Sequence, residues 1–219
     1  MNSNFDYRRC DRIGMPECIY CASKDPHLLQ ELLAELCRKK PHPILLTRLS
    51  EETFEKLDPA YTCEMNYDAF SETAFLHGVF PKLSTGLVSV VTAGTGDLSV
   101  ATETTRTLEY LGVPFQLFPD IGVAGLWRIE GNLEAINRAH VIVVIAGMDA
   151  AIVSVLGGLT PKPLIAVPTS VGYGVAQGGQ CALNSMLSSC APGVTVMNID
   201  NGYGAACAAF RIIKQIKPT

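Results

Sequence analysis

Three polar loops of this chain each combine glycines with a single carboxylate, and these residue types can hold phosphates and move protons. The first loop, residues 92–99, places Gly94 and Gly96 just before Asp97. Free backbone N–H groups in such a loop can hold a phosphate at the start of a helix. The loop is not a complete dinucleotide fingerprint, because Ser99 occupies the place of the third glycine. Asp97 is therefore either a site carboxylate or the N-cap of the helix.

The second loop, residues 146–152, carries Asp149. Only two other charged residues, Lys162 and Asp200, occur between residues 141 and 203. A carboxylate in such apolar surroundings is expected to have a raised pKa, which suits a general base or acid. The alternative is again a helix cap. We favour the catalytic interpretation and expect Asp149 to act on a proton.

Two further loops and one cysteine complete the candidate set. Residues 167–179 are too long and too rich in glycine to be a simple connection, and such loops are usually functional or disordered. Residues 198–204 combine two asparagines, an aspartate and two glycines. Cys190 follows a predicted helix instead of belonging to an apolar stripe. From composition alone it is expected to be a buried thiol without a catalytic role.

The elements that would position these loops alternate between strands and helices. Five apolar segments are predicted strands: 87–92, 115–118, 140–146, 164–167 and 194–197. Helical segments follow them, among them residues 97–111 and 125–139. This alternation is typical of a parallel, doubly wound α/β sheet with right-handed crossovers. Ligands of such sheets bind beyond the carboxyl ends of the strands, which is where all of these loops occur.

The N-terminal part of the chain has a different character. Residues 1–83 contain most of the charged residues and only two of the 19 glycines. Residues 28–38 carry leucines at helical spacing, residues 44–47 form a predicted strand, and a short helix begins at Ser50. We therefore predict a small N-terminal α/β unit, residues 1–83, and a larger domain, residues 84–219.

Composition excludes several classes of protein. Of the 219 residues, 48% are hydrophobic and 17% are charged, which excludes a disordered chain or a coiled coil. The net charge of −4 gives no basic surplus for nucleic acid. The polar start does not resemble a signal peptide, so we expect a cytosolic protein with reduced cysteines. Cys18 and Cys21 form a CxxC without a second pair, and a short strand is favoured there over a zinc site.

The segment from residue 163 to residue 199 has no charged side chain. It includes Pro168, several glycines and polar side chains, so it cannot cross a bilayer as one helix. A helix without charge on any face, such as residues 180–189, must be covered on all sides. We therefore expect no membrane association, and we expect a tight homo-oligomer in which neighbouring subunits cover this segment.

Taken in order, these loops strongly resemble the LarB family, and the C-terminal half of the chain is similar to PurE, the aminoimidazole ribonucleotide carboxylase/mutase. The resemblance covers about residues 12–211 and includes N-terminal segments, residues 14–17 and 46–48, that PurE does not have. It rests on six motifs, at residues 92–97, 120–126, 146–149, 167–174, 184–191 and 198–204. The fold that it implies is a flavodoxin-like or Rossmann-like parallel sheet with a small N-terminal α/β unit.

LarB enzymes act in the synthesis of the nickel-pincer nucleotide cofactor. They carboxylate the pyridinium ring of nicotinic acid adenine dinucleotide and hydrolyse its phosphoanhydride, which releases AMP. The resemblance implies that the Cys190 thiolate adds to the ring, and that the resulting enamine carbon takes up CO2. Asp149 stands where the family has the glutamate base that removes the ring proton. Asp97 matches an acidic residue of the first loop, near the ribose or the phosphates.

The same resemblance implies partners and binding residues. CO2 or bicarbonate is the co-substrate, no cofactor is tightly bound, and Mg2+ is a candidate aid to the hydrolysis. The implied assembly is an octamer or a tetramer of dimers. The implied dinucleotide-binding residues are Gly94, Thr95, Gly96, Arg128, Thr169, Ser170, Gly172, Tyr173, Asn198, Asp200 and Asn201.

Two positions depart from the family pattern and keep other functions open. Asp149 is one methylene shorter than the usual glutamate, and an ångström of misplacement can cost about 100-fold in rate. Trp127 stands where the family usually has histidine, although Arg128 is retained for a phosphate. One alternative is a PurE-like mutase, which needs a histidine in a Ser-Ala-His-Arg segment. The other is a nucleotide-binding paralogue without turnover.

Overall fold

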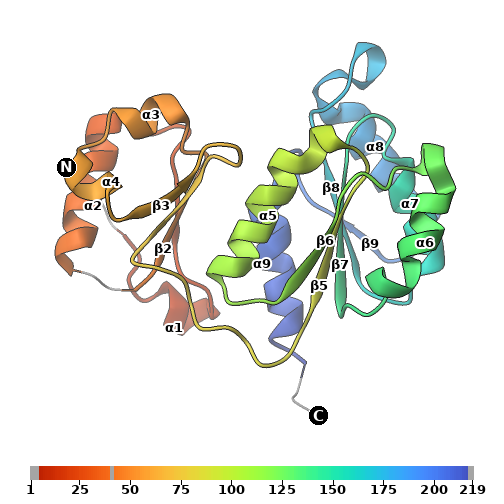
Figure 1. Ribbon diagram of the computed structural model, residues 1–219, viewed down its shortest axis with the longest axis horizontal. Coiled ribbons are helices and arrows are strands. Elements are labelled where there is room, and N and C mark those ends of the chain that lie inside the picture. The colour runs from red at the N-terminus through yellow and green to blue at the C-terminus, as the bar shows by residue number, and fades with distance from the viewer. Residues whose placement is uncertain (1–4, 40–41, 217–219) are drawn as a thin grey trace. The chain divides into compact units, whose positions relative to one another are not determined.

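The computed structural model describes residues 5–39 and 42–216. Its contacts divide the chain into two compact units, Met1–Pro81 and Lys82–Thr219. Each unit has a sheet and a hydrophobic core of its own (Figure 1). In the described ranges, no helix combines the length and the apolar character that crossing a bilayer requires.

The larger unit is built on a five-stranded parallel sheet with the order β6-β5-β7-β8-β9. Its strands are β5 (Val88–Thr92), β6 (Phe115–Phe118), β7 (Val141–Ala146), β8 (Leu164–Pro168) and β9 (Val194–Val196). Every residue of β5, β7 and β8 is buried, because helices cover both faces of the sheet. The predicted doubly wound α/β fold is confirmed.

Two layers of helices cover this sheet (Figure 1). Helices α5 (Leu98–Tyr110) and α9 (Gly202–Ile213) lie on one face, and α6 (Leu126–Ile136), α7 (Ala151–Leu159) and α8 (Gln180–Leu187) lie on the other. The core on the second face packs Ile142 and Val144 of β7 against Ile129, Leu156 and Met186. Short 3-10 turns, η1 (Thr95–Asp97), η2 (Val123–Gly125) and η3 (Gly174–Gly179), lie between strands and helices. The connections that carry the candidate residues therefore start from a rigid, buried platform.

The smaller unit has a four-stranded mixed sheet with the order β1-β2-β4-β3. Its elements are α1 (Arg9–Ile13), β1 (Cys18–Tyr20), α2 (Pro26–Lys39), β2 (Ile44–Thr47), α3 (Glu51–Glu55), α4 (Pro59–Thr62), β3 (Met65–Asp68) and β4 (Thr73–Leu76). The predicted leucine stripe of α2 packs on the sheet through Leu29, Leu33 and Leu36, which are fully buried. Cys18 lies in β1 and Cys21 is 3% exposed, as the strand interpretation requires.

The hairpin of β3 and β4 was not predicted. Every residue of β4 is buried, so the strand shows no alternation of polar and apolar residues. The turn also lacks the Asn-Gly or Asp-Gly pair of a tight hairpin. Instead the Asp68 carboxylate accepts hydrogen bonds from the backbone N–H and the hydroxyl of Ser71. This turn chemistry carries no strong local signal.

Candidate functional site

A cavity of about 270 Å3 lies at the carboxyl ends of the strands in the larger unit. Its walls come from the turns after β5, β6 and β7, with Val171 added from the segment after β8. The strand order places β5 between β6 and β7, so the order reverses between β5 and β7. Open α/β sheets bind ligands at such a switch point. The cavity therefore occupies the position that the fold predicts for a ligand.

Asp97 is the buried carboxylate of this site, with 3% of its surface exposed. Its Oδ2 accepts a 2.9 Å hydrogen bond from the Gly94 N–H, and its Oδ1 accepts a 2.7 Å bond from the Thr169 hydroxyl. The Gly147 N–H also donates to this carboxylate. Asp97 thus joins the loops after β5, β7 and β8. Its side chain does not cap α5, which excludes the simple N-cap interpretation.

The surroundings of Asp97 favour its protonated form. Burial raises the pKa of Asp97 above the ordinary 3.8, and the nearby Asp200 carboxylate acts in the same direction. The donors on Thr169, Gly94 and Gly147 act against this shift, but burial prevails. Asp97 is therefore a carboxyl whose hydrogen bonds are used mainly to hold the protein together.

The loop after β7 and the segment after β8 approach each other closely at Gly147. A Cβ atom at this position would lie 2.7 Å from the Thr169 hydroxyl and would collide with the Val171 carbonyl oxygen. Two backbone bonds fix the approach: Thr169 N–H donates to Ala146 O at 3.0 Å, and Met148 N–H donates to Val171 O at 2.9 Å. Only glycine fits at this position. The motif at residues 146–149 includes this glycine, but the sequence alone gives no reason for it.

Asp149 lines the cavity and is exposed. Its Oδ1 accepts a 3.3 Å hydrogen bond from the Ala151 N–H at the start of α7. The cavity wall around this carboxylate is mainly apolar, with Met148, Ile152 and Val171 in its lining. The neighbouring residues carry no charge, but they do not bury Asp149. Its carboxylate is free to meet a ligand while it supports the first turn of the helix.

Left-handed backbone conformations gather at the same edge of the sheet. Asp120, Met148, Ala150 and Asp200 have φ angles of 54°, 54°, 51° and 56°. Non-glycine residues rarely adopt this region, and such residues cluster at functional sites. Met148 and Ala150 flank Asp149 and fix the direction in which its side chain leaves the backbone.

A second group of predicted residues lies after β8 and β9. Asp200 Oδ1 accepts a 2.8 Å hydrogen bond from the Ser170 N–H. Asn201 caps α9, because its side-chain oxygen accepts a 2.7 Å bond from the Gly204 N–H. Asn198 is exposed and its side chain accepts from the Ile199 N–H. These residues shape the loop near Asp97, but they do not line the cavity.

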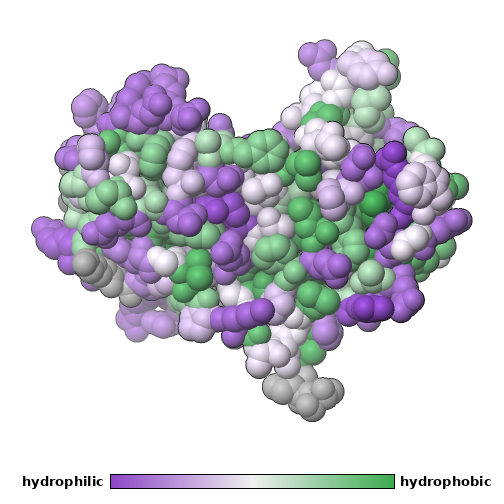
Figure 2. All heavy atoms as spheres, viewed as in Figure 1, coloured by the Kyte–Doolittle hydropathy of each residue, from purple (hydrophilic) through white to green (hydrophobic). Residues whose placement is uncertain are grey.

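Thr95, Gly172 and Tyr173 also lie outside the lining of the cavity. Tyr173 is 77% exposed, and Val175 beyond it is 97% exposed. Figure 2 shows the protruding segment after β8 at the upper right, mostly in pale and green spheres. Among the predicted binding residues of this segment, Ser170 and Tyr173 are exposed in the single chain, whereas Thr169 is buried.

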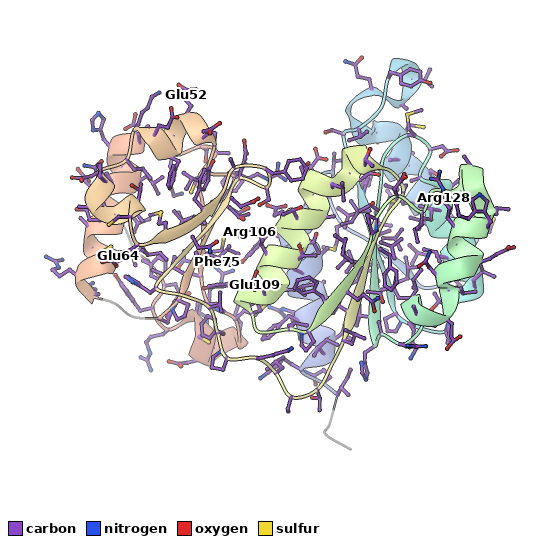
Figure 3. The ribbon with its side chains drawn as sticks, in the orientation of Figure 1. Glu52, Glu64, Phe75, Arg106, Glu109 and Arg128 are labelled. Carbon is purple, nitrogen blue, oxygen red and sulfur yellow. The ribbon has the colours of Figure 1, made fainter. Side chains whose placement is uncertain are left out.

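Arg128 belongs to the first turns of α6, next to the wall formed by η2 (Figure 3). Its Nη1 donates a 3.2 Å hydrogen bond to the Asp120 carbonyl and lies 3.4 Å from the Asp120 carboxylate. Its guanidinium lies 5.4 Å from the ring centre of Trp127. Arg128, which is predicted to bind a phosphate, is thus held near the end of β6, and Asp120 partly balances its positive charge.

Cys190 does not line the cavity of its own chain. It lies in residues 188–193, here called the Cys190 segment, which connect α8 to β9. Two of its residues contact α7: Ser189 Oγ is 2.8 Å from Ser154 Oγ, and Ala191 lies against Gly157. A helix rises 1.5 Å per residue, so Ser154 and Gly157 lie about 4.5 Å and about 9 Å beyond the start of α7 at the cavity. Cys190 is exposed, so the expectation of a buried thiol is wrong.

Comparison with known proteins places both units in one family. A family model described as AIR carboxylase matches residues 87–219, and a model of the LarB/PurE-like N-terminal domain matches residues 2–78. An uncharacterised protein from Methanocaldococcus jannaschii is 34% identical over 217 residues, which cover 95% of this chain and 83% of that protein. The chain belongs to the LarB family.

A further relative and a solved structure are similar to the AIR carboxylase domain of this LarB family member. The N5-carboxyaminoimidazole ribonucleotide mutase of Methanocaldococcus jannaschii is 31% identical over 134 residues, covering 58% of this chain and 78% of the mutase. The crystal structure of a single-residue variant of Treponema denticola PurE2 has a TM-score of 0.50 and 18% identity, covering 60% of this chain and 81% of that chain. The latter likeness shows the shared fold. Membership of this superfamily indicates a carboxylase or a mutase.

The candidate site has two further features within the described part of the chain. The described residues that line the cavity include no histidine, and His140 lies just before β7, where its ring accepts a hydrogen bond from the Leu87 N–H. Groups of three or more His, Cys, Asp and Glu side chains that could hold a metal ion do not occur among the described residues. Sequence reasoning missed the lining residues of η2, whose signal was the run of small residues between Asp120 and Leu126.

Proposed function

We propose that this protein carboxylates the pyridinium ring of nicotinic acid adenine dinucleotide and hydrolyses its phosphoanhydride, which releases AMP. The observation that carries the proposal is the cavity, which combines the glycine loop at Gly94 and Gly96 with the exposed carboxylate of Asp149. The membership of the chain in the LarB family supports the assignment of this chemistry.

The loop after β5 suits the phosphates of the dinucleotide. Gly94 and Gly96 line the cavity without side chains, so a ligand can approach the backbone closely. Asp97 holds this loop in place, because its carboxylate accepts a hydrogen bond from the Gly94 N–H. Arg128 supplies the positive charge for a phosphate at the neighbouring turn.

Asp149 suits the role of the base. Its carboxylate is at the cavity wall, exposed, and aimed by two left-handed neighbours. In the proposed sequence, the Cys190 thiolate adds to the cationic ring and produces an enamine. An enamine carbon then forms a bond to CO2, Asp149 removes the proton from that carbon, and the thiolate leaves as the ring regains its aromaticity.

The position of Cys190 requires an extension of this scheme. A thiolate that adds to the ring must come within bonding distance of one carbon of the same ring from which Asp149 removes a proton at another carbon. Cys190, however, lies outside the cavity of its own chain. We propose that a second copy of the chain supplies Cys190 in a homo-oligomer. The uncharged segment from residue 163 to residue 199, with its exposed apolar side chains, suits contact between copies.

The mutase alternative lacks a residue that it needs. Trp127 occupies the place of the histidine on which the mutase reaction relies, and the cavity is lined by no histidine in the described chain. The paralogue alternative keeps Arg128 and the glycine loop and predicts binding without turnover.

The test is incubation of the purified protein with nicotinic acid adenine dinucleotide and 13C-labelled bicarbonate. Mass spectrometry is expected to detect AMP and a labelled dicarboxylated pyridinium mononucleotide. A parallel incubation with N5-carboxyaminoimidazole ribonucleotide tests the mutase. Conversion of that compound alone, or binding of the dinucleotide without either product, would contradict the proposal.

A further inference from the structure

Trp127 is the single tryptophan of the chain, and 70% of its surface is exposed. Large aromatic side chains usually bury most of their surface, so an indole that faces solvent beside a cavity needs an explanation. The proposed reaction does not use it. Trp127 also replaces the residue type that the resemblance predicts at this position.

The indole is placed beside the cavity by the turn that precedes it. A Cβ atom at Gly125 would lie 3.1 Å from Trp127 Nε1 and 3.2 Å from Arg128 Nε. Both side chains therefore fold back over η2, and residues of the same turn, Val123 and Ala124, line the cavity. The Arg128 guanidinium lies 5.4 Å from the indole ring centre. An aromatic face and a cation thus lie together at the edge of a cavity with a glycine loop.

We propose that the exposed indole of Trp127 is the stacking surface for the adenine ring of the dinucleotide, with Arg128 binding the adjoining phosphate. Bases stack on aromatic side chains with a useful gain in affinity. The dinucleotide has two bases, the pyridinium ring and adenine, and the pyridinium ring must enter the cavity to reach Asp149. Adenine is the ring that remains for an aromatic surface outside the lining. The assignment rests on the proposed function, because it takes the dinucleotide as the ligand.

A binding measurement tests the assignment without turnover. Acrylamide quenching of the single tryptophan is measured alone and with AMP, nicotinic acid mononucleotide or ribose 5-phosphate. AMP is expected to shield the indole, and ribose 5-phosphate, which has a phosphate but no base, is not. Equal shielding by ribose 5-phosphate, shielding by nicotinic acid mononucleotide only, or an indole that is inaccessible before any ligand is added would overturn the assignment.

Substitutions give a second, independent readout. Trp127→Ala is expected to weaken AMP binding roughly tenfold in calorimetry. Trp127→Phe keeps a ring and should retain most of the affinity. Leu126→Ala is the matched control, because Leu126 is 53% exposed in the same turn and should leave AMP binding unchanged. Equal losses of AMP affinity in Trp127→Ala and Leu126→Ala would show that any loss of apolar surface in this turn weakens binding, and the assignment would be wrong.

The two proposals can fail separately. If AMP shields Trp127 but the dinucleotide is not converted, the proposed function fails and the stacking surface stands. If the dinucleotide is converted and Trp127→Ala binds AMP as tightly as the wild type, the proposed function stands and the stacking surface is wrong.

Discussion

The loops at the carboxyl ends of β5, β7 and β8 are joined by the buried carboxylate of Asp97, whereas the Cys190 segment is held by hydrogen bonds to the end of α8 and by the contact of Ser189 with α7. Asp97 receives donors from Thr169, Gly94 and Gly147. In the Cys190 segment, Ser189 makes one hydrogen bond with Ser154 and accepts one from the Ala191 N–H. The first region is positioned by its own sheet, and the second presents its thiol outward.

This difference indicates how the proposed chemistry is divided. A site that must place a base within an ångström needs rigid support, and the carboxyl-end loops have it. The exposed Cys190 would gain its support from another surface, as the proposed homo-oligomer provides. Substitutions in each region can show whether the two regions act together, and whether each does what its surroundings suggest.

The largest effect is expected for Cys190→Ser. A serine hydroxyl is hardly ionised at neutral pH, so carboxylation should fall on the order of a thousandfold or more. Co-expression of Cys190→Ser with Asp149→Asn subunits should then restore activity. If the partner supplies Cys190, random mixing leaves about a quarter of the sites with both intact residues. Carboxylation is measured on mixed oligomers that are isolated through two different affinity tags.

The control for this experiment is a mixture of the two variants that are purified separately and do not exchange subunits. Its activity should stay at the level of the parent variants. A mixed oligomer that is as inactive as its parents would show that one chain supplies both residues, and the division between the two regions would be wrong.

The next effect concerns Asp149. Asp149→Asn should lower carboxylation roughly 100-fold, because the amide cannot accept the ring proton. Asp149→Glu should keep or raise the activity, since it restores the length that the family uses. Both variants retain an oxygen for the Ala151 N–H, so kcat separates catalysis from the helix start. Unchanged kcat in Asp149→Asn would reduce Asp149 to a structural role.

The smallest effect is one of stability and concerns Asp97. Burial raises its folded-state pKa above 3.8, so protonation stabilises the fold. That contribution is complete below pH 3.8 and is lost as the pH rises through the folded-state pKa. Asp97→Asn should remove this loss. Relative to the wild type, the variant should gain on the order of 1 kcal/mol in urea unfolding as the pH rises toward neutrality.

Thr169→Val sharpens this measurement. The Thr169 hydroxyl lowers the pKa of Asp97, so its removal should raise that pKa further and steepen the loss of stability with pH. A difference between wild type and Asp97→Asn that does not change with pH would show that the Asp97 carboxyl does not change its charge state as its burial requires.

Much of the larger unit could be predicted from its sequence, because its central strands β5, β7 and β8 are buried and mainly apolar and its loops are marked by glycine. The β5 to β9 sheet follows from that pattern. The role of Asp97 could not be decided, because Thr169, its hydrogen-bond partner, is 72 residues away. Contacts of this kind depend on the folded sheet and leave no local mark.

Asp149 and Cys190 are both exposed, although the sequence around them carries little charge. Composition alone predicts a buried thiol at Cys190, and that expectation is wrong. An uncharged stretch of sequence shows only that no charge must be solvated. It does not show whether the covering atoms come from the same chain.

The left-handed residues Met148 and Ala150 have a consequence for how this loop can be improved. Each holds a conformation that costs on the order of 1–3 kcal/mol, a noticeable share of the roughly 5–15 kcal/mol by which a folded domain is stable. Glycine at either position would relieve that cost and would also loosen the direction of Asp149. Glycine at these two positions is therefore expected to favour stability and to lower turnover. A variant selected for stability alone would lose the fixed direction of the Asp149 carboxylate.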